Sequence, residues 1–249
     1  MLSMVRKWLF LGLVVTAAVT WFTRERLDTV NEIHPDALRP AEQTPANGAK
    51  PFQFTRNNYQ YEVTPLHEYT ISGLVVRRMD YSWFSIDRSE KIFPLDLCLI
   101  WGSNLRHKVH QAKTIRFSQD CRFCWVEWRE KLPFSMSELS NNHLLLSLPE
   151  VEKTLNRVMI GDQVKLRGKL VKVNARLVGK GGRYDSEAVT WTSSTTRNDT
   201  GAGACEVIYV EDAVVLRTAN ELSRVLFRGS LWGMAVLALW AFADLFRRF

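Results

Sequence analysis

The residues of this 249-residue chain that are best suited to chemistry are its four cysteines, Cys98, Cys121, Cys124 and Cys205. Cys121 and Cys124 form a C-x-x-C, the spacing at which redox proteins hold a reactive thiolate at the start of a helix. Here the motif lies in IRFSQDCRFCWVEW, which alternates like a strand or a hairpin. The cysteines therefore predict structural disulfides in which Cys98 and Cys205 each bridge to one cysteine of the pair. A redox pair or a metal site is the alternative.

The polar run SSTTRNDTGAGA, residues 193–204, is a second candidate site. Its triplet Asp199-Thr200-Gly201 matches the one that pepsin-like proteases use, but there the Asp follows an apolar strand and shares a proton with a second carboxylate. Because this triplet follows a polar run, we expect a flexible loop between two strands, where binding residues often lie. The possible binding loop comprises Arg197, Asn198, Asp199, Thr200 and Gly201.

The histidines give a weaker signal. His107 and His110 could share one helix face, but no carboxylate or thiolate nearby has the spacing of a third metal ligand. His143 ends the tetrapeptide SNNH, which we interpret as a cap or turn before the apolar LLLSL, with a catalytic His143 as the alternative. The sequence therefore predicts no metal, no cofactor and no assembled catalytic site.

Apolar segments near the two chain ends would hold these residues at a membrane. The first, Trp8–Phe22, is shorter than the roughly 20 residues that span a bilayer, but flanking basic side chains can extend it. A cleaved signal peptide is the alternative, and the aromatic pair at 21–22 favours an uncleaved anchor. The second, Gly229–Phe246, has only Ser230 as a polar residue before position 244, which favours a spanning helix over an amphipathic one.

Basic residues and cysteines together predict the orientation of the chain in the membrane. Arg6 and Lys7 precede the first segment and Arg247 and Arg248 follow the second, while the intervening loop carries all four cysteines. We therefore expect both termini in the cytoplasm and the centre of the chain in the periplasm of a bacterial inner membrane. The expected organisation is a membrane anchor (1–28), an extended linker (29–51), a mainly β domain (52–216) and a transmembrane helix (217–249).

The distribution of charge argues against nucleic acid as a partner. The formal net charge is +7, but residues 1–28 contribute +2 and residues 217–249 contribute +3, so the part between them keeps only +2. A nucleic-acid footprint needs clustered basic residues. The high isoelectric point therefore mostly reflects the flanks of the membrane segments, whose partner is lipid.

Strand signals dominate the central domain. Apolar and β-branched residues alternate in 69–77, 92–101, 115–128 and 163–173, and a last strand pair is expected at 188–192 and 206–216. Residues 149–160 form the one strong helix candidate, with a capping box at Ser147 and Glu150. This pattern predicts a mainly β (α+β) fold, either a small barrel of the OB type with bends at Gly73 and Gly168 or a sandwich.

Three segments carry a resemblance to a known group: DLCLIWG at 96–102, SNNHL at 140–144 and GDQVKLRGKLV at 161–171. Together they resemble a group of bacterial envelope proteins, over most of residues 60–215. The resemblance implies an inner-membrane location and no particular activity. We therefore expect a non-enzymatic, double-anchored protein whose periplasmic domain binds another envelope component, most simply a protein. The alternatives are an envelope thiol-disulfide oxidoreductase using Cys121 and Cys124, or an OB-type module that binds glycan.

Overall fold

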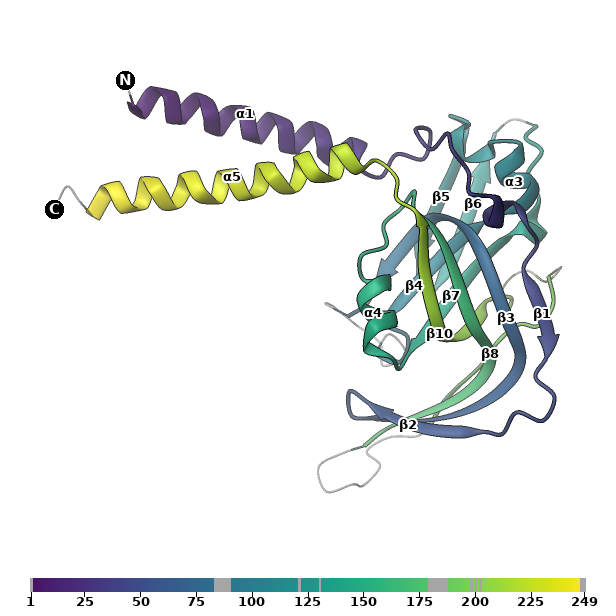
Figure 1. Cartoon of the computed structure of the whole chain (residues 1–249). Helices are drawn as coiled ribbons and strands as arrows, with labels where there is room; N and C mark the ends of the chain where they lie inside the picture. The colour runs from purple at the N-terminus through teal and green to yellow at the C-terminus, as the bar shows by residue number, and fades with distance from the viewer. Residues whose placement is uncertain are drawn as a thin grey trace.

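The chain forms one β-rich domain from which a pair of helices projects (Figure 1). The computed structural model describes residues 2–82, 91–120, 122–129, 131–178, 188–197, 199, 201 and 203–246. The mainly β composition and the two apolar terminal helices expected from the sequence are confirmed.

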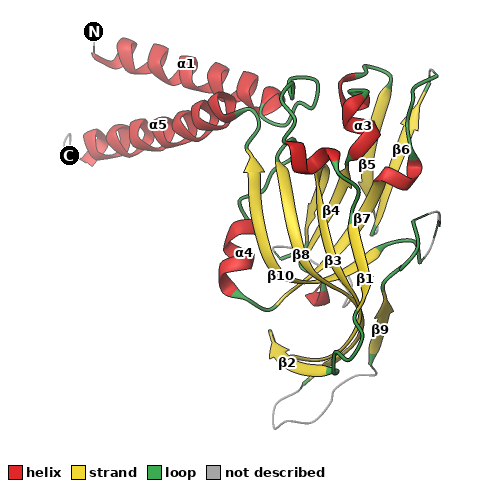
Figure 2. Cartoon of the chain, turned by 45° about the vertical axis from the view of Figure 1, so that its right-hand side comes forward, coloured by secondary structure: helices red, strands yellow, loops and turns green. Residues whose placement is uncertain are grey.

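The terminal helices α1 (Leu2–Thr23) and α5 (Glu221–Phe246) lie side by side and antiparallel, so that both chain ends meet far from the domain (Figures 1 and 2). Leu13 of α1 packs against Gly233 of α5, and Arg6 Nη1 lies 2.5 Å from Asp244 Oδ2. Their outer surfaces are largely exposed leucine, valine, phenylalanine and tryptophan. Both helices are long and apolar enough to cross a membrane.

Five strands of the main sheet pair in a cycle. They are β3 (Tyr59–Asp80), β4 (Leu95–Ile100), β7 (Leu139–Leu146), β10 (Glu206–Arg217) and β8 (Gln163–Leu177). Each pairs with the next in this order, and β8 pairs again with β3. β7 and β10 are parallel, and the other four pairings are antiparallel. β4 and β7 are buried along nearly their whole length, so they form the centre of the domain.

Two of the expected bends coincide with close backbone approaches. A Cβ on Gly168 would lie 2.0 Å from the carbonyl oxygen of Tyr209, next to a register shift between β8 and β10. A Cβ on Gly73 would lie 2.8 Å from the carbonyl oxygen of Ile100, where β3 passes from β8 to β4. Only glycine lets the backbones approach this closely, and these contacts let the long strands change partners.

The short strands and hairpins extend the sheet. β1 (Glu42–Pro45) and β2 (Phe52–Arg56) pair with β3, and β9 (Val189–Thr192) pairs with β8. The expected pairing of the last two strands is therefore wrong, because β9 and β10 lie on β8 instead of on each other. β5 (Ile115–Asp120) and β6 (Phe123–Trp128) form a separate hairpin, which stands beside the main sheet in Figure 2.

The helical segments are short. They are α3 (Gly102–Arg106), α4 (Pro149–Leu155) and the 3₁₀ turns η1 (Pro35–Leu38), η2 (Val109–Gln111) and η3 (Met136–Glu138). α4 buries Val151 and Leu155 but ends five residues before the expected position 160. The predicted capping box is wrong, because Leu148 is the N-cap residue and the Ser147 hydroxyl donates to the Tyr209 hydroxyl instead.

Residues 29–51 are not the extended linker expected from their prolines. Val30 and Ala37 are buried in the core cluster that also holds Leu74 and Ile100, and β1 pairs with β3. Ile33 and Leu38 pack against the same cluster, which the composition of the segment did not indicate. The domain therefore begins directly after α1 and includes these residues.

Candidate functional site

A buried ion cluster joins the two central strands. Asp96 of β4 and His143 of β7 are cross-strand partners in register, and Asp96 Oδ1 lies 3.0 Å from His143 Nδ1. Both side chains are completely buried. Arg122, from the turn between β5 and β6, places Nη1 2.8 Å from the same carboxylate oxygen and donates to the carbonyl of Phe93. The hairpin thus supplies a cation that helps to neutralise Asp96.

The charge of His143 follows from this arrangement. Burial favours the neutral ring, but the Asp96 carboxylate and, more weakly, Cys205 outweigh it and raise the pKa of His143 to about 9. The ring is therefore an imidazolium at neutral pH and forms an ion pair with Asp96. Phe93 and Trp191 pack on the ring, with centroids at 5.8 and 5.1 Å, which keeps water from the ion pair.

Cys205 lies at the open side of this cluster, immediately before β10. Its thiol is free and half-buried. Asn141 Nδ2 lies 3.6 Å from the sulfur and also donates to the carbonyl of Arg122, whose oxygen is 3.8 Å from the sulfur. Because β10 pairs with β7 in parallel from Glu206 and Asn142 onward, the residues just before that pair come together. Cys205 also interacts with the side chain of His143, so Cys205, His143 and Asp96 form one contiguous group.

One of the expected disulfides is present. Cys98 of β4 is bonded to Cys124 of β6, which ties the β5–β6 hairpin to the centre of the sheet. The C-x-x-C is therefore not a closed redox pair in this structure, since Cys124 is bonded elsewhere. Cys121 lies outside the described residues. With Cys98 on Cys124, the expected second bridge would join Cys121 to Cys205, but the thiol of Cys205 is free in this structure.

A cavity of about 520 Å³ opens at Cys205, between the hairpin, the start of β7 and the segment that precedes β10. Its walls include Cys124 and Asn141, and its rim carries Trp125, Trp128 and Met136, whose exposed fractions are 53%, 39% and 46%. A contiguous patch of large apolar side chains is rarely exposed on a soluble protein, and where one occurs it often marks a binding site. The cavity combines an apolar rim with a few polar groups, as ligand sites do.

The possible binding loop is only partly described. Asp199 and Gly201 line the cavity, while Asn198 and Thr200 lie outside the described residues. Asp199 accepts a hydrogen bond of 2.5 Å from the Ser194 hydroxyl, and its charge acts on the buried carboxyl of Glu206. A ligand role for this loop stays a prediction.

Arg197 anchors the loop to the domain. It forms an ion pair with the buried Glu206 and donates to the hydroxyl of Tyr69 at 2.5 Å. Burial raises the pKa of Glu206 to about 7, although Arg197 opposes the shift. Burial likewise raises the pKa of Tyr69. Arg197 therefore has a structural partner on each side, which fixes the loop next to Cys205.

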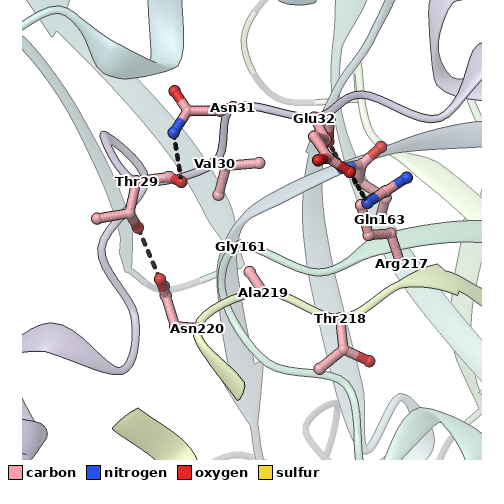
Figure 3. A pocket seen from close by; sticks show the side chains of 10 residues that line it. All are labelled: Thr29, Val30, Asn31, Glu32, Gly161, Gln163, Arg217, Thr218, Ala219 and Asn220. Atoms are coloured by element: carbon pink, nitrogen blue, oxygen red, sulfur yellow. Dashed lines mark hydrogen bonds and ion pairs between the residues drawn. The ribbon is translucent and has the colours of Figure 1, made fainter. Parts of the chain in front are cut away.

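A second cavity, of about 330 Å³, lies where the chain passes between helices and domain (Figure 3). Its polar side chains bond mostly to each other: Thr29 donates to Asn220 at 2.7 Å, and Arg217 pairs with Glu32. Beneath it, the buried Asp162 accepts from Arg224 of α5 at 2.7 Å. These contacts join the helix pair to the domain, and they leave little free polar capacity for a ligand.

Sequence reasoning missed the main features of the site. Ser140–His143 was expected to cap or turn the chain, but the segment is the first half of a central strand. The available signal was a pair of ionisable residues, Asp96 and His143, inside otherwise apolar runs, where a charge needs a partner. His107 is exposed and His110 is buried against the carbonyl of Val30, so they do not form a joint site. Among the described residues, no group of three side chains suits a metal ion.

Comparison of the chain with family models, with curated proteins and with solved structures found no match to any of them.

Proposed function

We propose that the chain is a double-anchored bacterial inner-membrane protein whose periplasmic domain binds another envelope component, a polypeptide, in the cavity beside Cys205. The antiparallel packing of α1 and α5 supports two spans of one bilayer, with both termini on the cytoplasmic side. The contact between Leu13 and Gly233 favours an uncleaved first helix. The Cys98–Cys124 disulfide supports an oxidising compartment for the domain.

The strand order supports a barrel of the OB type. OB domains are five-stranded Greek-key barrels that bind ligands on their second and third strands and on two neighbouring loops. In this chain the cycle β3, β4, β7, β10 and β8 supplies five strands, with α4 between β7 and β8. The second and third strands in chain order are then β4 and β7, which carry Asp96 and His143. The cavity lies beside them, at the position where such domains bind ligands.

The aromatic rim of the cavity is the observation that favours a polypeptide as the bound component. Tryptophan and methionine are enriched where proteins bind proteins, and here Trp125, Trp128 and Met136 stand exposed around one cavity. The site also lies far from the bilayer. It is at the start of the 12-residue β10, whose other end leads to α5, roughly 35 Å along the strand. A soluble or periplasmic partner therefore fits better than a lipid.

A photo-crosslinking amino acid at Trp125 in living cells tests this proposal. We expect a crosslinked polypeptide at position 125 and none at Val214, an equally exposed residue further along β10. The double variant Trp125→Ala/Trp128→Ala should weaken capture of the same polypeptide by the affinity-purified full-length protein. If neither position gives a crosslinked polypeptide, the proposal fails.

A glycan is the second candidate ligand. Exposed tryptophans next to Asn141 and Asp199 could stack on sugar rings and bond their hydroxyls. Sedimentation of the detergent-solubilised protein with purified peptidoglycan distinguishes the two ligands. Retention that is lost in Trp125→Ala/Trp128→Ala would favour the glycan, while no retention would leave the polypeptide.

A further inference from the structure

The Cys205 thiol has the surroundings of a reactive nucleophile. A cysteine is activated when a cationic group stabilises its thiolate and when a third group orients that cation. Here His143 is the cation and interacts with Cys205, and Asp96 holds its Nδ1 at 3.0 Å. Both ring nitrogens of His143 are buried, and neither makes a well-aligned hydrogen bond within the described part of the chain. Because Nδ1 is the ring atom next to Asp96, Nε2 is the one that remains for the sulfur of Cys205.

Two cationic side chains lie close to the sulfur. Arg122 and the imidazolium of His143 both contact the Asp96 carboxylate. The other buried acid nearby, Glu206, is bonded to Arg197. Asn141 Nδ2, at 3.6 Å, points a further donor toward the Cys205 sulfur.

The sulfur is also accessible. Cys205 is half-buried and lines the 520 Å³ cavity, whereas Asp96 and His143 are sealed behind it. A second sulfur, that of Cys124 in its bond to Cys98, lines the same cavity. A molecule bound in the cavity would therefore meet the Cys205 sulfur, with the buried His143 and Asp96 behind it.

We propose that Cys205 is the attacking thiol of a thiol-disulfide exchange with a disulfide-bearing polypeptide bound in this cavity, with His143 as acid and Asp96 as a positioning residue. The Cys205 sulfur attacks one sulfur of the partner disulfide and forms a mixed disulfide with it. The partner's S–S bond breaks, and the leaving thiolate takes the Nε2 proton of His143. The Cys205 sulfur is oxidised, the leaving sulfur is reduced, and the ring becomes neutral.

This assignment differs from an exchange through Cys121 and Cys124. Cys124 is already bonded to Cys98, whose side chain is completely buried. The proposal rests on the proposed binding of a polypeptide in this cavity. Its test uses a small aromatic disulfide as the probe, so that a failure of the chemistry at Cys205 can be told from a failure of polypeptide binding.

The test measures the reaction of 5,5′-dithiobis(2-nitrobenzoate) with the full-length protein in detergent at pH 6.5. A mild reductant first opens any exchangeable bridge of Cys205 and is then removed, and the adduct is located by peptide mass spectrometry. We expect the native protein to react at Cys205 about tenfold faster than the same protein unfolded in urea, since unfolding removes the imidazolium. No reaction at Cys205, or faster reaction in urea, would overturn the proposal.

Variants separate activation from simple exposure. His143→Gln and Asp96→Asn should slow the Cys205 reaction by about ten- to a hundredfold, the factor that a hydrogen bond to a charged group typically contributes. His110→Gln is the matched control, because His110 is also buried but bonds to the carbonyl of Val30. Equal rates in wild type, His143→Gln and His110→Gln would refute activation by His143. If a variant fails to fold, the ratio of the Cys205 reaction rates in native and unfolded wild-type protein still shows whether the fold activates Cys205.

Discussion

Replacing Asp96 by Asn should destabilise the domain strongly and change its response to pH. Asp96 is the single carboxylate that both Arg122 and His143 contact, at 2.8 and 3.0 Å, and all three side chains are buried. The substitution leaves the shape nearly unchanged but removes the buried carboxylate that Arg122 and His143 share. Breaking a buried pair in this way costs about 3–5 kcal/mol.

The raised pKa of His143 gives a second, independent value for the free energy that Asp96 contributes by stabilising a buried cation. Its pKa rises from 6.5 to about 9 in the folded protein, and each unit corresponds to about 1.4 kcal/mol, so the charged ring contributes about 3 kcal/mol. Because the folded pKa is the higher one, this stabilisation is complete below pH 6.5 and is lost as pH rises through 9. In Asp96→Asn the buried ring of His143 is neutral, so the loss of folding stability between pH 6.5 and 9 should disappear.

Urea unfolding of the full-length protein in detergent, followed by tryptophan fluorescence, measures both effects. Asp212→Asn is the matched control, because Asp212 forms an exposed pair with Arg167 at 3.8 Å, and such pairs contribute about 0–1 kcal/mol. The reasoning is refuted if Asp96→Asn is no less stable than Asp212→Asn at pH 6.5, or if the wild type keeps its stability up to pH 9.5.

Three further predictions concern other parts of the domain. Glu206 has a folded pKa of about 7, above its ordinary 4.5, so the wild type should lose stability as pH rises from 5 to 7.5, and Glu206→Gln should flatten this change in urea midpoints. Gly168→Ala would place a Cβ 2.0 Å from the carbonyl oxygen of Tyr209 and should lower the free energy of unfolding by about 2 kcal/mol or more. Gly229→Ala is the control, because open space surrounds Gly229, and it should leave the urea midpoint nearly unchanged. Equal midpoints for the two variants would contradict the close approach at Gly168. Cys98→Ser opens a bridge between residues 26 apart and should cost about 3 kcal/mol, a loss that reductant should reproduce in the wild type.

Much of the fold was predictable because the patterns that determine it are local. Strand alternation located the strands that became β3, β5, β6 and β8, and the apolar runs located both terminal helices. Gly73 and Gly168 marked two places where backbones approach closely. The burial of residues 29–51 was not predictable, because it depends on a groove formed by residues distant in sequence.

The site was harder to predict because it depends on register. Asp96 and His143 meet only because β4 and β7 pair with these residues opposite each other, and Cys205 joins them only because β10 runs parallel to β7. A one-residue slip in either pairing would move a side chain to the other face. The disulfide partner of Cys98 was likewise one of several choices that spacing alone left open.

The orientation of the chain in the membrane is the central claim, since the disulfide, the exchange chemistry and the partner all depend on an oxidising compartment. The direct test labels single added cysteines with a membrane-impermeant maleimide in spheroplasts, in a protein whose Cys121 and Cys205 are replaced by serine so that only the added thiol reacts. Lys50→Cys, an exposed position on the domain, should be labelled in intact spheroplasts, and Lys7→Cys, near the start of α1, should be labelled only after lysis. Labelling of Lys7→Cys in intact spheroplasts, with Lys50→Cys protected until lysis, would contradict the account.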